Sequence, residues 1–407
     1  MRKFFVSDRI GAERLSNDNS AVVFGKAHYS WKIISNLYQR ALHNVGAEVI
    51  SISRPEVYQT DVALSTIFAT AKDMHLAVKP IEELRPMPGI KNLFVCGWEF
   101  PEISQTDYGI SPFYNQFRIL NGADAVLCWS DFTRDNLRKV GIDKSVTLPP
   151  PVTDQQITSV PAIPALPCLA LDTSSASGQE NVFLLDDLFR SFKNGKVFVS
   201  VLNPFDERKR LIALLNGFQA AIDAGANIYL VIKLVIDNIA TTTGNINEIL
   251  RTRYNYEATS KRIFFVGSQF SDTEMRSLFS AADFYVCTSS CEGLNLPLVG
   301  AMRQGKPIVS TWNSAMGTYL DQKSSIEIEC ETETLTGRGH SLATYMPVTH
   351  FPPKGGAVGR AILEAYQLSQ ISYNEIASGA LKAAEENFGL PRFASRLESL
   401  INSINQD

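Results

Sequence analysis

"FFVGSQFSDTEMRSLFSAADFYVCTSSCEGLNLPLVGAMRQGKPIVS", residues 264–310, alternates short apolar runs with longer amphipathic segments. The apolar runs are too short for helices and are bounded by polar or turn-forming residues, which predicts buried strands. Between the first two runs, Ser271 and Glu274 have the spacing of a capping box, which opens a helix. Pro297 suits the first turn of a second helix, because it has no N–H to leave unbonded there. Strands that alternate with helices in this way predict a parallel sheet with helices on both faces.

The same rhythm extends outward over two stretches of the chain. In the second half the pattern begins with a strand at Lys196–Leu202, and in the first half strand patterns such as Asn92–Trp98 alternate with helix patterns. Residues 153–190 interrupt the rhythm, are rich in Pro, Ser and Thr, and are expected to form an irregular connection. We therefore expect an α/β protein of two Rossmann-like domains facing a cleft, residues 1–190 and residues 191–385. Ligands of such sheets bind beyond the carboxyl ends of the strands.

The composition excludes several classes of protein. Lys and Arg number 38 and Asp and Glu number 42, so the chain lacks the basic excess of a nucleic-acid-binding protein. The most apolar stretch, Asn227–Ile236, is interrupted by Lys233 and is about half as long as a membrane span, which favours a buried strand. The apolar run at the start is too short for a signal peptide. We therefore expect a cytoplasmic protein and leave open peripheral contact with the inner face of the cell membrane.

The cysteines do not have the spacing of a metal site. The chain has six, with no Cys-x-x-Cys pair, and no histidine lies near Cys287 and Cys291 in the sequence. We expect reduced thiols that fill small apolar gaps. Neither a bound metal nor a cofactor is expected.

Glu292 lies at the start of a helix, beside a glycine. The backbone N–H groups from Gly293 to Leu296 precede or begin that helix, and such a helix end attracts phosphate. A carboxylate is a good acceptor for sugar hydroxyls, so this stretch suits a phosphorylated sugar. The alternative is that Glu292 only stabilises the helix dipole. This stretch alone leaves both interpretations open.

A basic turn follows the first strand of the second half. Arg208, Lys209 and Arg210 lie at the start of a helix, where cations oppose the helix dipole. This placement favours a role in binding an anion at the carboxyl end of the strand. The alternative is a solvated basic turn.

Residues 197–310 resemble the donor-binding half of glycosyltransferase family 4, whose members have the GT-B fold. The family pattern contains "vG…s..el…l…ad..v..S..EGfGlp..EAm..G.PVv", and residues 264–310 agree with it in order and spacing. Weaker agreement in the first half, at "VCGWEFPEIS" and "VLCWSDFTRDNL", is with polysaccharide-assembling members. The resemblance covers most of the chain apart from residues 153–190 and parts of 50–90. It implies that residues 386–407 form a helix that crosses back onto the first domain.

The resemblance also implies roles for residues of the second half. Glu292 would contact the donor sugar, and Lys209, with Arg208 beside it, would bind the diphosphate. Amides of the turn after Glu292 would approach the sugar and the distal phosphate, and the loop after the "FFVG" strand would pack against the base. The residues concerned are Gly293, Asn295 and Leu296 for the turn, and Gly267 to Phe270 for the loop.

Two positions depart from the family pattern. The second Glu of the family's E-x7-E signature, which holds the ribose, is Gly300 here, and Asn203 stands where many members have an arginine. The first departure has three competing explanations: a donor with a different pentose, another residue that holds the ribose, or lost activity. Gly300 also leaves space in which the nucleotide could lie closer to the helix.

The first half offers candidates for the acceptor side of the cleft. Trp98 and Glu99 stand where many family members have a histidine-containing segment. Glu99 ends a strand and is expected to face the cleft, with a surface carboxylate as the alternative. Gly25 and His28 lie at the exit of an early strand, like the family's glycine-containing loop near the phosphates and the acceptor.

The expected function is a retaining, hexosyltransferase-type glycosyltransferase. It would transfer a sugar from a nucleotide-diphosphate sugar to a growing polysaccharide or lipid-linked glycan, without a metal. A sugar-nucleotide-binding pseudoenzyme and a phosphorylase-like GT-B enzyme are the alternatives. The sequence leaves the oligomeric state open.

Overall fold

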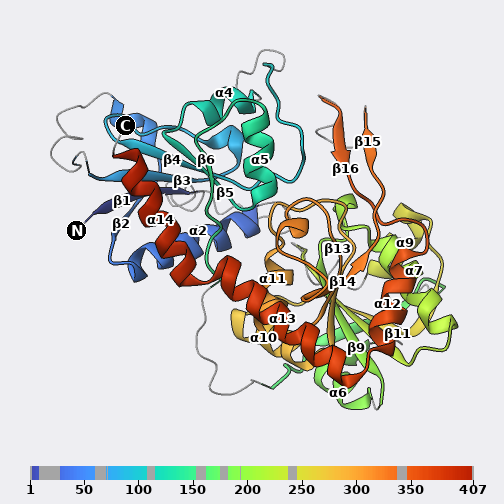
Figure 1. The fold of residues 1–407 in the computed structure, drawn as a ribbon. Coiled ribbons are helices and arrows are strands. Elements are labelled where there is room, and N and C mark those ends of the chain that lie inside the picture. Colours follow the sequence, from blue (N-terminus) through green and yellow to red (C-terminus); the bar gives the residue numbers. More distant parts are fainter. Residues whose placement is uncertain are drawn as a thin grey trace.

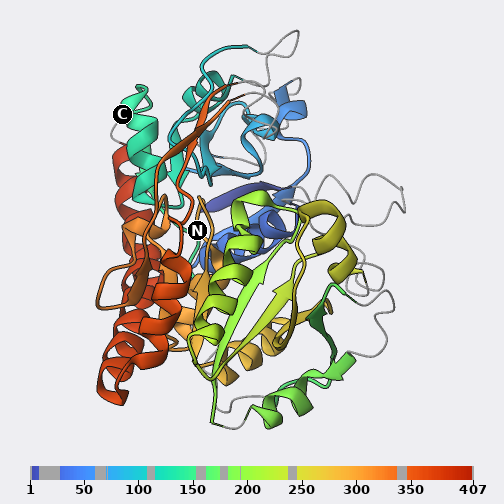
Figure 2. The same cartoon turned by 90° about the vertical axis from the view of Figure 1, so that its right-hand side faces the viewer.

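The computed structural model describes residues 2–8, 28–59, 70, 72–107, 115–152, 162–174, 182–192, 194–236, 245–336 and 346–405. These residues form two lobes, each built on a sheet that helices cover (Figure 1). The last helices run along one side of both lobes (Figure 2). The prediction of an α/β protein with two Rossmann-like layers is confirmed.

The first lobe contains a six-stranded parallel sheet in the order β2-β1-β3-β4-β5-β6. Most of its strands are almost continuously buried, as expected when helices cover both faces of a parallel sheet. Its strands are β1 (Lys3–Asp8), β2 (Glu48–Ile52), β3 (Met74–Val78), β4 (Lys91–Cys96), β5 (Ala125–Cys128) and β6 (Ser145–Thr147). Its helices are α2 (His28–Asn44), η1 (Pro55–Gln59), η2 (Ile81–Glu83), α4 (Gln116–Asn121) and α5 (Asp131–Lys139).

The second lobe contains an eight-stranded sheet in the order β14-β13-β12-β9-β10-β11-β7-β8, parallel except for β7 and β8. Its strands are β7 (Pro167–Asp172), β8 (Val182–Leu184), β9 (Lys196–Leu202), β10 (Ile228–Leu234), β11 (Thr259–Val266), β12 (Phe284–Cys287), β13 (Ile308–Thr311) and β14 (Ser325–Ile328). Its helices are α6 (Leu185–Ser191), η4 (Glu207–Lys209), α7 (Leu211–Asp223), α9 (Ile246–Tyr254), α10 (Asp272–Ala281), α11 (Leu296–Arg303), η5 (Met316–Thr318) and α12 (Ala357–Gln367).

The connection between the lobes is more regular than the sequence suggested. Of residues 153–190, which we expected to be irregular and grouped with the first domain, the described part forms β7, β8 and most of α6. β7 pairs antiparallel with β11, so this segment extends the second sheet. The backbone hydrogen bonds of β7 are made with a strand about ninety residues away in the sequence. The local sequence pattern does not predict such a distant partner.

The C-terminal helices return to the first lobe, as expected. α13 (Gln370–Phe388) ends at Gly389, and α14 (Leu390–Ile404) begins with a proline in its first turn. The ring of Phe393 on α14 lies 6.0 Å from that of Tyr38 on α2. The amide of Val152 also donates to the carbonyl of Phe388 (2.9 Å). The first lobe therefore contacts the chain on both sides of the bend between α13 and α14.

An antiparallel hairpin makes a further contact between the lobes. It consists of β15 (Glu333–Leu335) and β16 (Val348–His350) and projects from the second lobe toward the first (Figure 1). Val348 is buried among first-lobe residues such as Phe100, and the amide of Thr349 donates to Glu102 of the first lobe (2.9 Å). On the other side, Arg210 donates to Nδ1 of His350 (3.0 Å), which links the hairpin to the basic turn.

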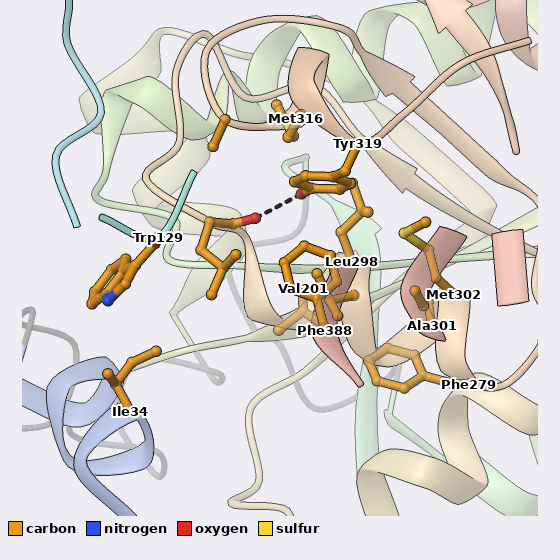
Figure 3. Close-up of a cluster of buried hydrophobic side chains, with 14 of the residues drawn as sticks. Ile34, Trp129, Val201, Phe279, Leu298, Ala301, Met302, Met316, Tyr319 and Phe388 are labelled. Atoms are coloured by element: carbon orange, nitrogen blue, oxygen red, sulfur yellow. Dashed lines mark hydrogen bonds between the residues drawn. The ribbon is translucent and has the colours of Figure 1, made fainter. Parts of the chain in front are cut away.

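A cluster of buried side chains packs against α11 (Figure 3). Phe279 of α10 packs there with Leu298 and Met302 of α11. The hydroxyl of Tyr319 donates to the carbonyl of Leu294 (2.6 Å), just before the helix begins. These contacts fix the position of the helix that follows Glu292.

Among the described residues, no helix combines the length and the apolar character needed to cross a membrane. The six cysteines are all free thiols, and burial raises the pKa of each, as for Cys291, whose pKa is about 12.

Candidate active site

A cavity of about 250 Å³ lies between the two lobes. It lies at the carboxyl ends of β4, β5 and β9, where ligands of parallel sheets bind. The first lobe contributes Trp31, Ile34, Gly97, Glu99 and Trp129. The second lobe contributes Val201, Leu202, Asn203, Asp206, Arg208, Lys209, Val235 and the stretch Glu292 to Pro297.

The basic turn is shaped by Asp206. This residue is the N-cap of η4, and its carboxylate accepts a hydrogen bond from the amide of Arg208 (3.1 Å). The same carboxylate accepts from Nε and Nη2 of Arg208, at 3.0 and 2.8 Å. The paired guanidinium is thereby held toward the first lobe.

Arg208 forms an ion pair with Glu99 across the cleft. Burial raises the pKa of Glu99, and the guanidinium of Arg208 opposes that effect. Burial alone would lower the pKa of Arg208, but the carboxylates of Glu99 and Asp206 raise it well above its usual value. Glu99 therefore faces the cleft and is not a surface carboxylate.

Lys209 and Glu292 are bound to each other. The ammonium of Lys209 donates to Oε1 of Glu292, and the two residues lie 83 positions apart in the sequence. Burial alone would lower the pKa of Lys209, but the carboxylates of Glu292 and Asp206 outweigh it and raise the pKa. The two residues that the resemblance assigned to the diphosphate and to the sugar thus share one position in the cleft.

The helix cap is Asn295 and not Glu292. The side chain of Asn295 accepts a hydrogen bond from the amide of Leu298, and its φ of 69° begins the helix in the left-handed region. The amide of Glu292 instead donates to the hydroxyl of Ser314 (2.8 Å), and its carbonyl accepts from the amide of Ala315 (3.2 Å). The backbone of Glu292 is therefore anchored, while its carboxylate faces the cleft.

The turn before α11 offers backbone donors to a ligand. Within the part of the chain that the structure describes, no acceptor contacts the amides of Gly293 and Leu294. These amides precede a helix N-terminus, where a negative charge is stabilised. Gly293 also lies against the first lobe, since a Cβ there would be 2.8 Å from the carbonyl oxygen of Gly97. Only a glycine allows the two backbones to approach so closely.

The space beside Gly300 is filled. A Cβ at this position would lie 3.1 Å from the ring of Phe279, so a glutamate there would require that ring to move. The space expected at Gly300 is therefore taken up by the ring of Phe279.

The remaining candidates divide between the cavity and other parts of the fold. Asn203 and Leu296 line the cavity. Gly267 and Phe270 follow β11 and do not line it. Gly25 lies outside the described residues, and the structure places the backbone of His28 at the start of α2.

Trp98 points away from the cleft. Its indole N–H donates to the carbonyl of Glu102 (2.7 Å), and its ring packs 5.6 Å from that of Phe100 in the first-lobe core. Of the two neighbouring candidates, only Glu99 lines the cavity.

Several residues that line the cavity were not predicted from the sequence, among them two tryptophans and an aspartate. Trp31 and Trp129 form an aromatic pair, with ring centroids 5.0 Å apart, on the first-lobe side. Trp129 directly follows a strand pattern in the sequence, and this position could have identified it as a candidate cleft residue. Asp206 stands two residues before Arg208, which is the spacing of an N-cap.

Residues 195–334 match a family described as "Glycosyl transferases group 1". This part of the chain is similar to that family. The matched range contains the basic turn, Lys209 and Glu292. No curated protein matches the chain.

Several solved structures share the fold at low sequence identity. Sucrose-phosphate synthase from Thermosynechococcus elongatus has a TM-score of 0.61 and 13% identity, with all of both chains covered. A structure from E. coli, described as trehalose-6-phosphate bound with UDP-2-fluoro glucose, has a TM-score of 0.59 and 12% identity, covering 100% of this chain and 99% of the other.

A variant of TarM from S. aureus, in complex with fondaparinux, alpha-GlcNAc-glycerol and UDP, has a TM-score of 0.51 and 14% identity. The alignment covers 84% of this chain, which spans only 57% of the TarM chain. These structures confirm the GT-B fold, and the family match over residues 195–334 supports the prediction of a glycosyltransferase. Membership of family 4 and retention of configuration stay predictions.

Proposed function

We propose that the protein transfers a sugar from a nucleotide-diphosphate sugar to a glycan acceptor, with retention at the anomeric carbon. One observation carries the proposal. Lys209 and Arg208, at the carboxyl end of β9, meet Glu292 and the unbonded amides of Gly293 and Leu294 in the cavity between the lobes.

The leaving diphosphate develops negative charge, and this site is built to stabilise it. Lys209 supplies a cation, and the amides before α11 supply oriented dipoles, in the cleft between the lobes. Glu292 is then the acceptor for hydroxyls of the donor sugar. Donor binding requires Lys209 to share its hydrogen bonds between Glu292 and the phosphate.

Glu99 faces the acceptor side of the cavity and is paired with Arg208. As an ionised acceptor, it can orient the attacking hydroxyl. We include in the proposal an acceptor that is a growing polysaccharide or a lipid-linked glycan, and a cytoplasmic location with peripheral contact at the inner face of the membrane. Support for a nucleotide donor comes from TarM, whose structure contains UDP.

A binding protein without turnover is the second candidate. Gly300 in place of a carboxylate and Asn203 in place of an arginine remove two polar contacts of the family pattern. The phosphorylase-like alternative would need a cofactor-binding lysine, and the lysine lining the cavity is already paired with Glu292.

Two measurements separate these candidates. A thermal-shift panel of nucleotide sugars identifies the donor, because a ligand that binds the folded state raises its apparent stability. Release of nucleoside diphosphate with that donor, in the presence of glycan acceptors, then supports an enzyme. Binding without release across the acceptor panel would support the pseudoenzyme.

Catalysis is expected to be independent of metal. Among the described residues no group of three or more His, Cys, Asp or Glu side chains could hold a metal ion, and the carboxylates of the cavity are paired with Arg208 and Lys209. Turnover should therefore survive EDTA. A strict requirement for Mg²⁺ or Mn²⁺, restored by adding the ion back, would contradict this mechanism.

Gly293→Ala is expected to lower turnover about tenfold, because an added Cβ would force the two lobes apart at Gly97, and small misplacements of reacting groups are costly. Affinity for nucleoside diphosphate should change little, since that ligand binds mainly to the second lobe. Gly355→Ala is the control, because a Cβ there meets no atom within 4 Å. Equal turnover in both variants would show that the close approach does not matter.

A further inference from the structure

Lys233 is a partly buried cation near the donor side of the cavity. It lies near the end of β10, and its register partners are Val201 on β9 and Val266 on β11. Val231 and Val235 pack on the same face of the sheet as Val201, and side chains alternate along a strand, so Lys233 belongs to that face as well. Val201 and Val235 both line the cavity.

Few favourable interactions offset the cost of burying the charge of Lys233. Burial lowers its pKa to about 8, and within the described residues no hydrogen-bond acceptor or carboxylate contacts its ammonium. The ring of Phe270 lies 5.8 Å from Nζ, a distance at which a cation–π contact recovers only part of the lost hydration. A cation held in this way destabilises the fold unless a ligand binds it.

The cavity reaches Val235, two residues beyond Lys233, although Lys233 itself does not line it. Glu292 and Lys209 lie where the sugar and the diphosphate bind under the proposed function. From there the cavity passes Asn203 and Val235, at the ends of β9 and β10. The next strand is β11, which leads to Phe270. A nucleoside that extends from a diphosphate at Lys209 past Val235 would approach Lys233.

We propose that Lys233 determines nucleotide specificity by donating hydrogen bonds to an oxygen of the nucleoside. This proposal rests on the proposed function, since it assumes a nucleoside diphosphate at Lys209. The oxygen belongs to a keto group of the base or to the 2′-hydroxyl of the ribose. If the oxygen is the 2′-hydroxyl, Lys233 replaces a ribose contact that Gly300 cannot make. Adenine has no keto oxygen, so uracil or guanine is preferred if the base is read.

Calorimetry with UDP, GDP and ADP tests this assignment. The 2′-deoxy form of UDP or GDP, whichever of the two binds more tightly, is measured as well. Lys233→Met is expected to weaken binding of that tighter ligand about tenfold or more, the scale of a hydrogen bond to a charged group. If the base is read, the substitution weakens the 2′-deoxy form equally and leaves ADP unchanged. If the ribose is read, it weakens ADP as well and leaves the 2′-deoxy form unchanged.

Lys196→Met is the matched control. Lys196 lies at the opposite end of the neighbouring strand β9 and also faces an aromatic ring, that of Tyr373, at 5.4 Å. Its replacement should leave all four affinities unchanged. Lys233→Met should unfold at the same or a higher temperature than the wild type, because it removes a buried charge. Weaker binding together with a lower unfolding temperature would indicate a damaged fold and contradict the proposal.

Two further outcomes separate this proposal from the function on which it rests. If Lys233→Met binds UDP and GDP as tightly as the wild type does, while Lys209→Ala binds them poorly, Lys233 does not contact the nucleoside and the proposed function stands. If the wild type binds no nucleoside diphosphate, both proposals are wrong.

Discussion

Replacing Lys209 by alanine is expected to weaken nucleoside diphosphate binding by more than about tenfold, or about 1.4 kcal/mol. Turnover should fall by about 10²-fold or more, because the cation acts mainly on the charge that develops on the leaving diphosphate. The residue lines the same cavity as Gly293 and Leu294, whose amides are unbonded, and under the proposed function these groups bind the diphosphate together. Calorimetry measures the first effect and initial rates of donor turnover the second.

The ion pair with Glu292 offers a competing explanation for such a loss. Without Lys209, the carboxylate of Glu292 is left without its partner in a partly buried site and repels the diphosphate. The double variant Lys209→Ala/Glu292→Gln removes that repulsion. If Lys209 binds the phosphate, the double variant stays weak. Wild-type affinity in the double variant would mean that the lysine only neutralises its neighbour.

The sequence predicted well the features that depend on local chemistry. Ser271 and Glu274 form the expected capping box, and Pro297 lies in the first turn of α11. Each of these depends on residues within one turn of the chain, where spacing alone determines geometry. The basic turn could be placed at the end of β9 for the same reason.

Contacts between distant segments could not be predicted in this way. Glu99 and Arg208 are 109 residues apart, and their pairing depends on how the two lobes meet. The pairing of β7 with β11 and the insertion of Val348 into the first lobe likewise depend on tertiary packing. Trp98 was assigned to the cleft because a strand end does not reveal which of two adjacent side chains faces inward.

Glu292→Gln is expected to lower turnover by about 10²-fold or more, the scale of a lost hydrogen bond in the transition state. The substitution keeps the shape of the side chain, and its amide oxygen can still accept from Lys209. It removes the charge that strengthens hydrogen bonds from the donor sugar. Nucleoside diphosphate has no sugar at this position, so its affinity should stay equal or increase as a nearby negative charge is lost.

The helix-dipole interpretation of Glu292 predicts a different result for the same variant. Asn295 already caps α11, so a role for Glu292 in helix stability would appear as a lower unfolding temperature and not as a loss specific to sugar transfer. Asn295→Ala is the matched comparison, since loss of an N-cap destabilises by about 1 kcal/mol. Normal turnover by Glu292→Gln, or loss of diphosphate binding without loss of the fold, would refute the assignment of this carboxylate to the donor sugar. If turnover falls while the unfolding temperature and the affinity for diphosphate stay unchanged, neither the fold nor diphosphate binding explains the loss. The carboxylate of Glu292 then binds the sugar hydroxyls.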